Sequence, residues 1–303
     1  MSDSRGARRL TRQLAMALEP VAAQVYFAPE CHEAYRELGF GPSPGQLPNG
    51  VQLPDGAAYF TSRGSVMGQV SGELVAAAFA VFNPEAVVPA VAFGWSKTDA
   101  ETICSARTAG ACAHLVRILG EAPSGLARAT ELLAVAVAPL RPEGRPLYAG
   151  LLSLGLPGDP IGDMWRRADL LREYRGDAHI NAWTSAGVGA CEMCLLTEPY
   201  WGLPLRTYSR TRAWGDGDFD SAEARLIDRG WLEEGGLTEA GWAEREGIEV
   251  ATDRQCKPAI DAVGDDLDEL IATLSSWGAE IRKAKGYPAS GPQELADLAM
   301  SRR

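Results

Sequence analysis

Two arginines, a histidine and a tryptophan recur at helical spacing in the segment LREYRGDAHINAW, residues 171–183. Arg172, Arg175, His179 and Trp183 follow one another at steps of three, four and four, so a helix places all four on one face. Guanidinium groups beside an imidazole and an indole suit an anionic or aromatic ligand. The segment therefore predicts a ligand-binding face, with the arginines as anchors and Trp183 as a stacking wall.

The same face also suggests proton transfer. An unperturbed histidine titrates near neutral pH, which suits His179 to act as a general base. Asp177 and Glu192 are the carboxylates expected to orient the imidazole, provided that the helix geometry brings them into contact. An enzyme of secondary metabolism is therefore one alternative, and the sequence leaves open whether the protein is an enzyme.

These charged side chains have a second interpretation. Arginine and histidine residues also gather in ion-pair networks that only hold helices together. Glu173, Asp177 and Glu192 are the nearby carboxylates that could pair with them. A large loss of stability on alanine substitution of His179 or Arg175 would favour this structural role over ligand binding.

A second group of candidate residues lies in the aromatic-rich region of residues 59–95. Arg63, Met67, Phe82 and Trp95 are predicted to line an apolar cavity that faces the helix described above. The alternative is an ordinary hydrophobic core, which aromatic side chains at helical spacing usually form.

Motifs of metal, redox and nucleophilic chemistry are missing. The sequence CEMC, residues 191–194, has no second pair of ligands at zinc spacing and does not follow a strand, so we expect buried helical cysteines. There is no GxSxG, no P-loop and no GxGxxG after a strand. We predict no metal site and no cofactor.

The segments that must position these residues are helical almost throughout. Helical spacing covers residues 10–39, 59–95, 99–119, 124–139, 164–187, 189–198 and 265–288. The Pro- and Gly-rich run 141–163 predicts a boundary between an N-terminal lobe, residues 1–150, and a C-terminal lobe, residues 151–303. We expect a mainly α protein with two lobes of winged-helix type and short β wings.

The winged-helix prediction rests on residues 212–249. Phe219, Ala222, Leu226 and Trp231 recur at roughly helical spacing, and a Gly-containing turn and a further helix follow. This order is typical of a recognition helix that leads into a short wing. The segment, however, carries eleven acidic residues against four arginines, whereas a helix that contacts phosphates must be cationic.

The charge of the whole chain points the same way. The net charge of −11 repels nucleic acid and anionic membranes at long range. Clusters of basic residues occur only near the termini, from Arg5 to Arg12 and from Arg282 to Arg303, where solvated tails are the usual explanation. No apolar stretch approaches about 18 residues and no signal peptide is visible. We expect a cytoplasmic protein with no membrane contact and with its six cysteines reduced.

Three segments carry a resemblance to a known family: LREYRGDAHINAW, YFTSRGSVMGQV (residues 59–70) and RGWLEEGGLTEAGWAEREGIEVATD (residues 229–253). Together they resemble a family of actinobacterial helix-turn-helix proteins of unassigned activity. The resemblance covers nearly the whole chain and implies a winged-helix fold with a small-molecule pocket. More distantly, the chain is similar to tandem winged-helix proteins that confer antibiotic self-resistance. Some of these are DNA glycosylases, but their catalytic QxQ motif is absent here.

These observations favour a protein of secondary metabolism or self-resistance that holds a small organic ligand between its lobes. A DNA-binding transcription regulator is the alternative that the helix-turn-helix resemblance implies. The sequence leaves the oligomeric state open, a homodimer included.

Overall fold

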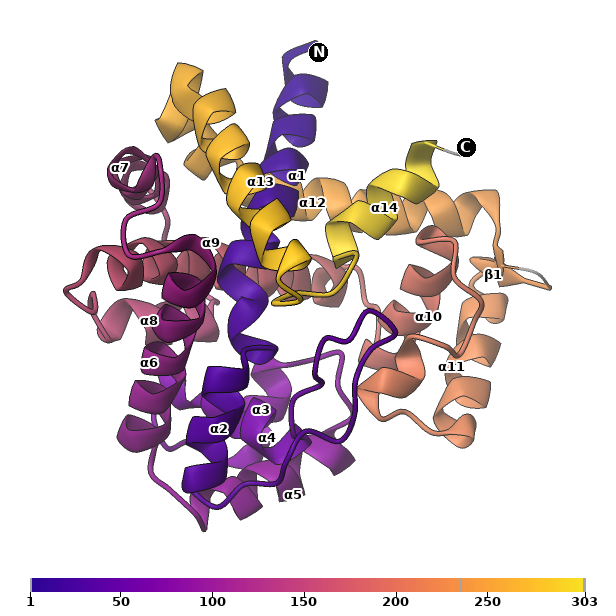
Figure 1. The fold of residues 1–303 in the computed structure, drawn as a ribbon. Coiled ribbons are helices and arrows are strands. Elements are labelled where there is room, and N and C mark those ends of the chain that lie inside the picture. Colours follow the sequence, from indigo (N-terminus) through magenta and orange to yellow (C-terminus); the bar gives the residue numbers. More distant parts are fainter. Residues whose placement is uncertain (1, 235, 302–303) are drawn as a thin grey trace.

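Helices make up most of residues 2–234 and 236–301, which are the residues that the computed structural model describes (Figure 1). The α-helices are α1 (Ser2–Ala23), α2 (Pro29–Glu37), α3 (Gly56–Gly64), α4 (Gly72–Ala78), α5 (Pro84–Trp95), α6 (Ala100–Leu119), α7 (Leu126–Val137), α8 (Pro146–Ser153), α9 (Pro160–Ser185), α10 (Ala190–Tyr200), α11 (Asp216–Asp228), α12 (Glu239–Val263), α13 (Leu267–Lys283) and α14 (Pro292–Ser301). The 3-10 helices are η1 (Gln24–Tyr26), η2 (Ser65–Met67), η3 (Ser209–Arg212) and η4 (Gly264–Asp266). A two-stranded antiparallel hairpin, β1 (Leu232–Glu233) and β2 (Gly236–Leu237), lies between α11 and α12.

This architecture confirms the predicted mainly α fold. The start of α5 shows why the local sequence was informative: Asn83 accepts a hydrogen bond from the backbone N–H of Glu85, and Pro84 occupies the first helical turn. One segment contains an element that was not expected. The run 141–163, predicted as a domain boundary, contains α8, in which Leu147 and Leu151 lie one turn apart and are both buried.

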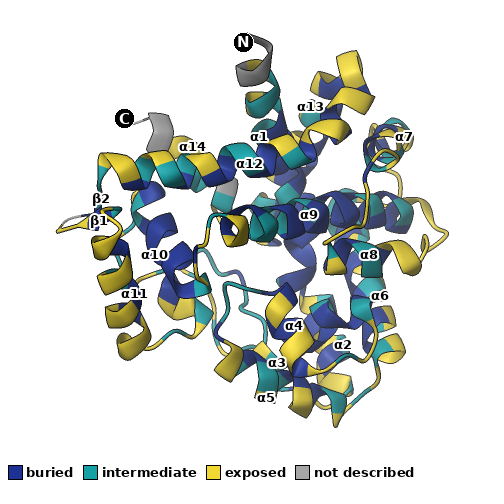
Figure 2. Ribbon diagram, turned by 180° about the vertical axis from the view of Figure 1, so that it is seen from behind, coloured by how far each residue is buried: buried dark blue, intermediate teal, exposed yellow. Residues whose placement is uncertain are grey.

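The central element is α9, a helix of 26 residues that α1, α7, α8 and α12 surround (Figure 2). The side chain of Asp159 caps its first turn by accepting from the N–H of Gly162, and Pro160 is its first residue. The helix runs without a break through Gly176. Most of its side chains are buried, because different faces of α9 pack against α1, α6, α7, α8 and α12.

The buried apolar side chains form two clusters. The larger one joins α1–α8, most of α9, the end of α12 and α13, and it therefore includes residues on both sides of residue 150. The smaller one joins the end of α9 to α10, α11, β1 and the start of α12. The division of the chain into lobes 1–150 and 151–303 remains a prediction.

Helix α11 buries the apolar stripe that the sequence predicted, because Phe219, Ala222 and Leu226 all lie in the smaller cluster. The hairpin that follows is very short, with Leu232 opposite Leu237. The chain then enters α12, whose first turn is capped by the side chain of Thr238.

Gly241 shows how closely α12 approaches the hairpin. A β-carbon at this position would lie 2.0 Å from the carbonyl oxygen of Trp231, so the backbone would have to move. We expect Gly241→Ala to lower the free energy of unfolding by about 1–3 kcal/mol, measured by urea denaturation. Gly247→Ala is the matched control, because nothing lies within 4 Å of a β-carbon there, and it should be neutral or stabilising. Equal effects of the two changes would contradict this close contact.

The terminal arginines are not all solvated tails. Arg12 pairs with Glu246 and Asp253 of α12, and Arg282 pairs with Glu294 of α14. The expected charge at Arg302 and Arg303 lies outside the described residues. Within the described ranges, no helix combines the length and the apolar character needed to cross a membrane.

Candidate functional site

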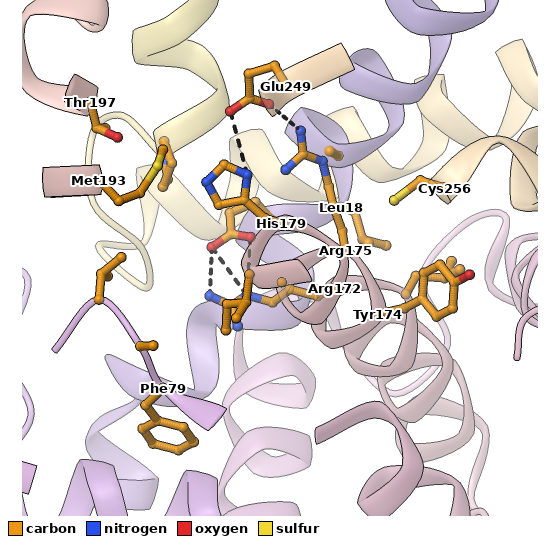
Figure 3. A pocket seen from close by; sticks show the side chains of 18 of the residues that line it. Leu18, Phe79, Arg172, Tyr174, Arg175, His179, Met193, Thr197, Glu249 and Cys256 are labelled. Carbon is orange, nitrogen blue, oxygen red and sulfur yellow. Dashed lines mark hydrogen bonds and ion pairs between the residues drawn. The ribbon is translucent and has the colours of Figure 1, made fainter. Parts of the chain in front are cut away.

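A cavity of about 280 Å³ lies at the centre of the molecule, between α9 and the elements that face it from both halves of the sequence (Figure 3). Side chains of α1, α3, α9, α10, α12 and η3, together with the turn of residues 79–82 after α4, line it. Ligand pockets usually measure about 300–1,000 Å³, so this cavity suits a molecule of one or two rings.

Five of the predicted site residues meet at this cavity. Arg63, Phe82, Arg172, Arg175 and His179 all contribute to its lining. They come from α3, the turn after α4, and three successive turns of α9. The side chains predicted on α9 and those predicted in the aromatic-rich region therefore meet at one cavity. Neither sequence pattern by itself showed that the two sets lie close together.

Three other predicted residues lie elsewhere. The indole N–H of Trp95 donates to the carbonyl of Val70 at 2.7 Å, outside the cavity lining. Trp183 is buried in the smaller apolar cluster, because α10 and α11 cover the end of α9. Met67 lines a separate hollow beside Val70 and Asn181. The expectation that these side chains form the walls of the same pocket was wrong.

Glu173 is the hub of the first ion-pair network at the cavity. Its carboxylate accepts from Arg63 Nε at 3.0 Å and Nη2 at 2.7 Å, and from Arg172 Nη1 at 2.8 Å. The hydroxyl of Tyr26 donates to it at 3.0 Å. Burial by itself would raise the pKa of Glu173, but the charges of the two arginines outweigh it and lower the pKa to about 2. Arg172 also pairs with Glu19, so both arginines are neutralised.

A second network joins α9 to α12. Arg175 Nη2 lies 2.9 Å from Glu249, which also accepts from Arg245 Nη1 at 2.8 Å. Arg175 lies 3.5 Å from Asp253, which accepts from Arg12 at 2.7 Å. The sequence analysis gave ion pairing as the alternative role of Arg175, and Arg175 does form ion pairs. Its partners are carboxylates of α12 rather than Asp177 or Glu192.

His179 is held in one tautomer. Its Nδ1 lies 3.1 Å from the hydroxyl of Thr252, and that hydroxyl donates its only hydrogen to the carbonyl of Ile248 at 2.9 Å. Nδ1 must therefore be the donor, and Nε2 keeps its lone pair as an acceptor. Burial lowers the pKa of His179 to about 4, so the ring is neutral at neutral pH.

The predicted contacts of His179 with Asp177 and Glu192 do not form. Two helical steps place Asp177 on roughly the opposite side of α9, where it accepts from the backbone N–H of Tyr148 at 3.0 Å. Burial raises the pKa of Asp177 to about 7. Glu192 lies in the first turn of α10, where it accepts from the N–H of Gly189 and pairs with Arg225 of α11. The expected arrangement of these three groups was therefore wrong.

Arg212 is one of the lining residues that sequence reasoning missed, together with Arg245 and Glu249. It lines the cavity from η3, donates from Nη2 to the hydroxyl of Tyr208 at 2.6 Å, and stacks its guanidinium 4.6 Å from the ring centre of Phe82. Asn83 fixes this segment, because its backbone N–H donates to the carbonyl of Arg212 at 2.9 Å and its side chain donates to Ala213. The stretch before α11 has no periodic pattern, so no local signal pointed to it.

Among the residues that the structure describes, no group of three or more His, Cys, Asp or Glu side chains is placed to hold a metal ion. Cys191 and Cys194 are buried on α10, and burial raises the pKa of each thiol to about 12. Both thiols stay protonated at neutral pH, a state that disfavours metal binding and nucleophilic attack.

Comparison with known proteins gave one match. A family model described as a helix-turn-helix family matches residues 11–288, which include every residue of the cavity lining named above. No curated protein and no solved structure matches the chain.

Proposed function

The chain belongs to this helix-turn-helix family, and from that premise we propose that it is a small-molecule-binding member whose ligand occupies the central cavity. The observation that carries the proposal is the cavity itself, where aromatic and polar side chains converge from α3, α9, α10, α12 and η3. Ligand pockets are mostly apolar with a few convergent polar groups, and this lining has that composition.

The chemistry of the lining suits a flat ligand. The rings of Tyr59 and Phe82 lie 5.8 Å apart and those of Trp201 and Tyr208 lie 5.0 Å apart, so two aromatic pairs border the cavity. His179 offers its neutral Nε2 as a hydrogen-bond acceptor. Such a ligand is proposed to be a secondary metabolite, which is consistent with the resemblance to self-resistance proteins.

The same proposal includes a winged-helix origin for the part of the chain beyond α9. Packing of α10 against α11, followed at once by a short antiparallel hairpin, supports this interpretation. In winged-helix proteins the second of these helices contacts DNA. Here the exposed side chains of α11 include Asp216, Asp218, Asp220 and Asp228.

Filling the cavity tests the proposal. Ala80 lines the cavity and is only partly buried, so Ala80→Phe should block binding without disturbing the core. We expect a panel of one- and two-ring aromatic molecules, neutral and charged, to include compounds that bind the unchanged protein in calorimetric titrations. Those compounds should bind Ala80→Phe at least about tenfold more weakly. Ala77→Phe, on the exposed side of α4, is the control. If no compound binds, or if binding survives Ala80→Phe, the proposal fails.

A DNA-binding regulator is the second candidate, and the family description favours it. Most of the affinity of a DNA-binding helix comes from cationic contacts with phosphates, which the acidic residues of α11 oppose. We therefore expect no retardation of duplex DNA at about 50 mM salt, where phosphate contacts are strong. A shift that weakens steeply as salt rises would establish the regulator instead, with the cavity as its effector site.

An enzyme that uses His179 as a general base has less support. Efficient general bases have a pKa near the working pH, whereas burial lowers the pKa of His179 to about 4. The hydrogen-bond partner of its Nδ1 is the hydroxyl of Thr252 at 3.1 Å, and the carboxylate of Glu249 lies farther away, at 3.9 Å. If His179 acts only as a neutral acceptor, the affinity for a neutral bound compound should stay constant from about pH 6 to about pH 8.

A further inference from the structure

Arg212 differs from the other arginines that line the cavity because it has no carboxylate partner. Arg63, Arg172, Arg175 and Arg245 each lie within 2.9 Å of a glutamate oxygen. Across the described ranges, no carboxylate oxygen forms an ion pair with Arg212, whose one side-chain hydrogen bond goes to the hydroxyl of Tyr208. The cavity wall therefore carries one positive charge that the protein itself does not balance.

The neighbours of Arg212 confirm that this charge is uncompensated. Burial raises the pKa of Tyr208, so its hydroxyl stays a neutral phenol at neutral pH and supplies no negative charge. The Nε atom of Arg212 is buried without an acceptor. A guanidinium keeps its proton in proteins, so the group remains cationic with free donors. A partly buried cation without an ionic partner is costly, and an anion that bound here would lower that cost.

The surroundings of Arg212 define the rest of the binding partner. Its guanidinium carbon lies 4.6 Å from the ring centre of Phe82 and 4.3 Å from that of Tyr208. Tyr59 and Trp201 extend these two rings on either side. An anionic group held by Arg212 would therefore be attached to a body that lies among aromatic side chains.

The remaining charges at the cavity set a limit on the charge of the ligand. Glu19 and Glu249 also line it, and each is held by arginine: Glu19 by Arg172, and Glu249 by Arg175 and Arg245. These carboxylates would repel a second negative group. Because the lining has one arginine that no carboxylate neutralises, it suits a ligand with a single negative charge.

We infer that the ligand of this cavity is a small aromatic carboxylic acid whose carboxylate pairs with Arg212 while its rings lie against Phe82 and Tyr208. A planar guanidinium suits a carboxylate because it can donate two parallel hydrogen bonds. The volume of about 280 Å³ limits the acid to one or two fused rings. This inference rests on the proposed function, because it names the chemical class that the same cavity accepts.

The test uses two probes of nearly equal shape, 1-naphthoate and its neutral amide, 1-naphthamide. Calorimetric titration should show that the unchanged protein binds the carboxylate at least about tenfold more tightly than the amide. Arg212→Met keeps the apolar stem against Phe82 and should remove this preference. Arg212→Lys keeps the charge but cannot donate two parallel hydrogen bonds to a carboxylate. Its affinity for naphthoate should lie between that of the unchanged protein and that of Arg212→Met.

Arg210→Met is the matched control. Arg210 belongs to the same helix, η3, and its removal changes the net charge equally, but its side chain is 52% exposed and pairs with Asp216 at 2.6 Å. It should leave the affinity for naphthoate unchanged. The melting temperature of each variant shows whether it folds. If Arg212→Met does not fold, Arg212→Lys carries the test, and it must bind naphthoate more weakly than the unchanged protein does.

The outcomes separate the two proposals. Equal binding of naphthoate and naphthamide, with no effect of Arg212→Met, would overturn the carboxylate assignment and leave the cavity as the binding site of a neutral ligand. Binding of neither probe, together with failure of the wider aromatic panel, would overturn the proposed function and this inference with it. Equal loss of naphthoate binding in Arg210→Met would show that only long-range charge matters, which would also refute the direct contact.

Discussion

Replacement of Glu173 with alanine is expected to lower the free energy of unfolding by about 3–5 kcal/mol. The side chain is fully buried, and its carboxylate joins Arg63 and Arg172 at 2.7–2.8 Å and accepts from the hydroxyl of Tyr26. Removal of one side of a buried pair leaves charge without compensation in a medium that solvates it poorly. Arg63 would lose its only carboxylate partner among the residues that the structure describes. Urea denaturation followed by circular dichroism measures the change.

A surface pair provides the control for this prediction. Glu33 pairs with Arg36 at 2.7 Å on α2, but these side chains are 62% and 52% exposed. Glu33→Ala should therefore change stability by only about 0–1 kcal/mol. Glu173→Gln keeps the shape of the side chain, so its loss in the free energy of unfolding should lie between those of Glu173→Ala and Glu33→Ala. If Glu173→Ala costs no more than Glu33→Ala, the network around Glu173 does not stabilise the fold.

Replacement of Asp177 with asparagine is expected to stabilise the protein at about pH 8 by up to roughly 4 kcal/mol and to have little effect at about pH 4. Burial raises the pKa of this carboxyl from 3.8 to about 7. Between these two values the folded state holds a proton that the unfolded state has released. The protonated Asp177 therefore costs no stability below about pH 4, and the free energy of unfolding falls as the pH rises from there toward 7. Asparagine resembles the protonated form and can still accept from the N–H of Tyr148.

Glu173, which is buried, and His179, which is partly buried, act in the opposite direction. The pKa of Glu173 falls from 4.5 to about 2, and that of His179 falls from 6.5 to about 4. Both depressed values make the folded protein more stable as the pH rises through these ranges. They are present in the unchanged protein and in Asp177→Asn alike, so the difference between the two proteins isolates Asp177. A stability difference that stays constant from about pH 4 to about pH 8 would show that Asp177 is not desolvated as described.

The sequence predicted α9 and the face that Arg172, Arg175 and His179 share, because both depend on the periodicity of one continuous helix. The cap at Asn83 and the apolar stripe of α11 were predictable for the same reason, since they arise from residues close together in the chain. The short helix α8 was missed because it lies in a run, residues 141–163, that is rich in proline and glycine.

The partners of these side chains could not be predicted from the same patterns. Arg175 pairs with Glu249, which is 74 residues away, and Arg63 pairs with Glu173, which is 110 residues away. Packing decides which of many carboxylates lies within about 3 Å of a given arginine, and a change in helix rotation or crossing angle would exchange one for another. The expected orientation of His179 by Asp177 failed because residues two apart on a helix face different sides.

The sequence by itself determined the helices, their buried stripes and the acidic character of the chain beyond residue 212, because propensity, periodicity and charge are local properties. Only the tertiary structure decided which of the arginines that line the cavity are neutralised and that Arg212 is not. Whether a charge is compensated depends on distances between segments far apart in sequence and on how fully water is excluded around them. For that reason Arg212, one of 29 basic residues in the sequence, became identifiable only after the chain was folded around it.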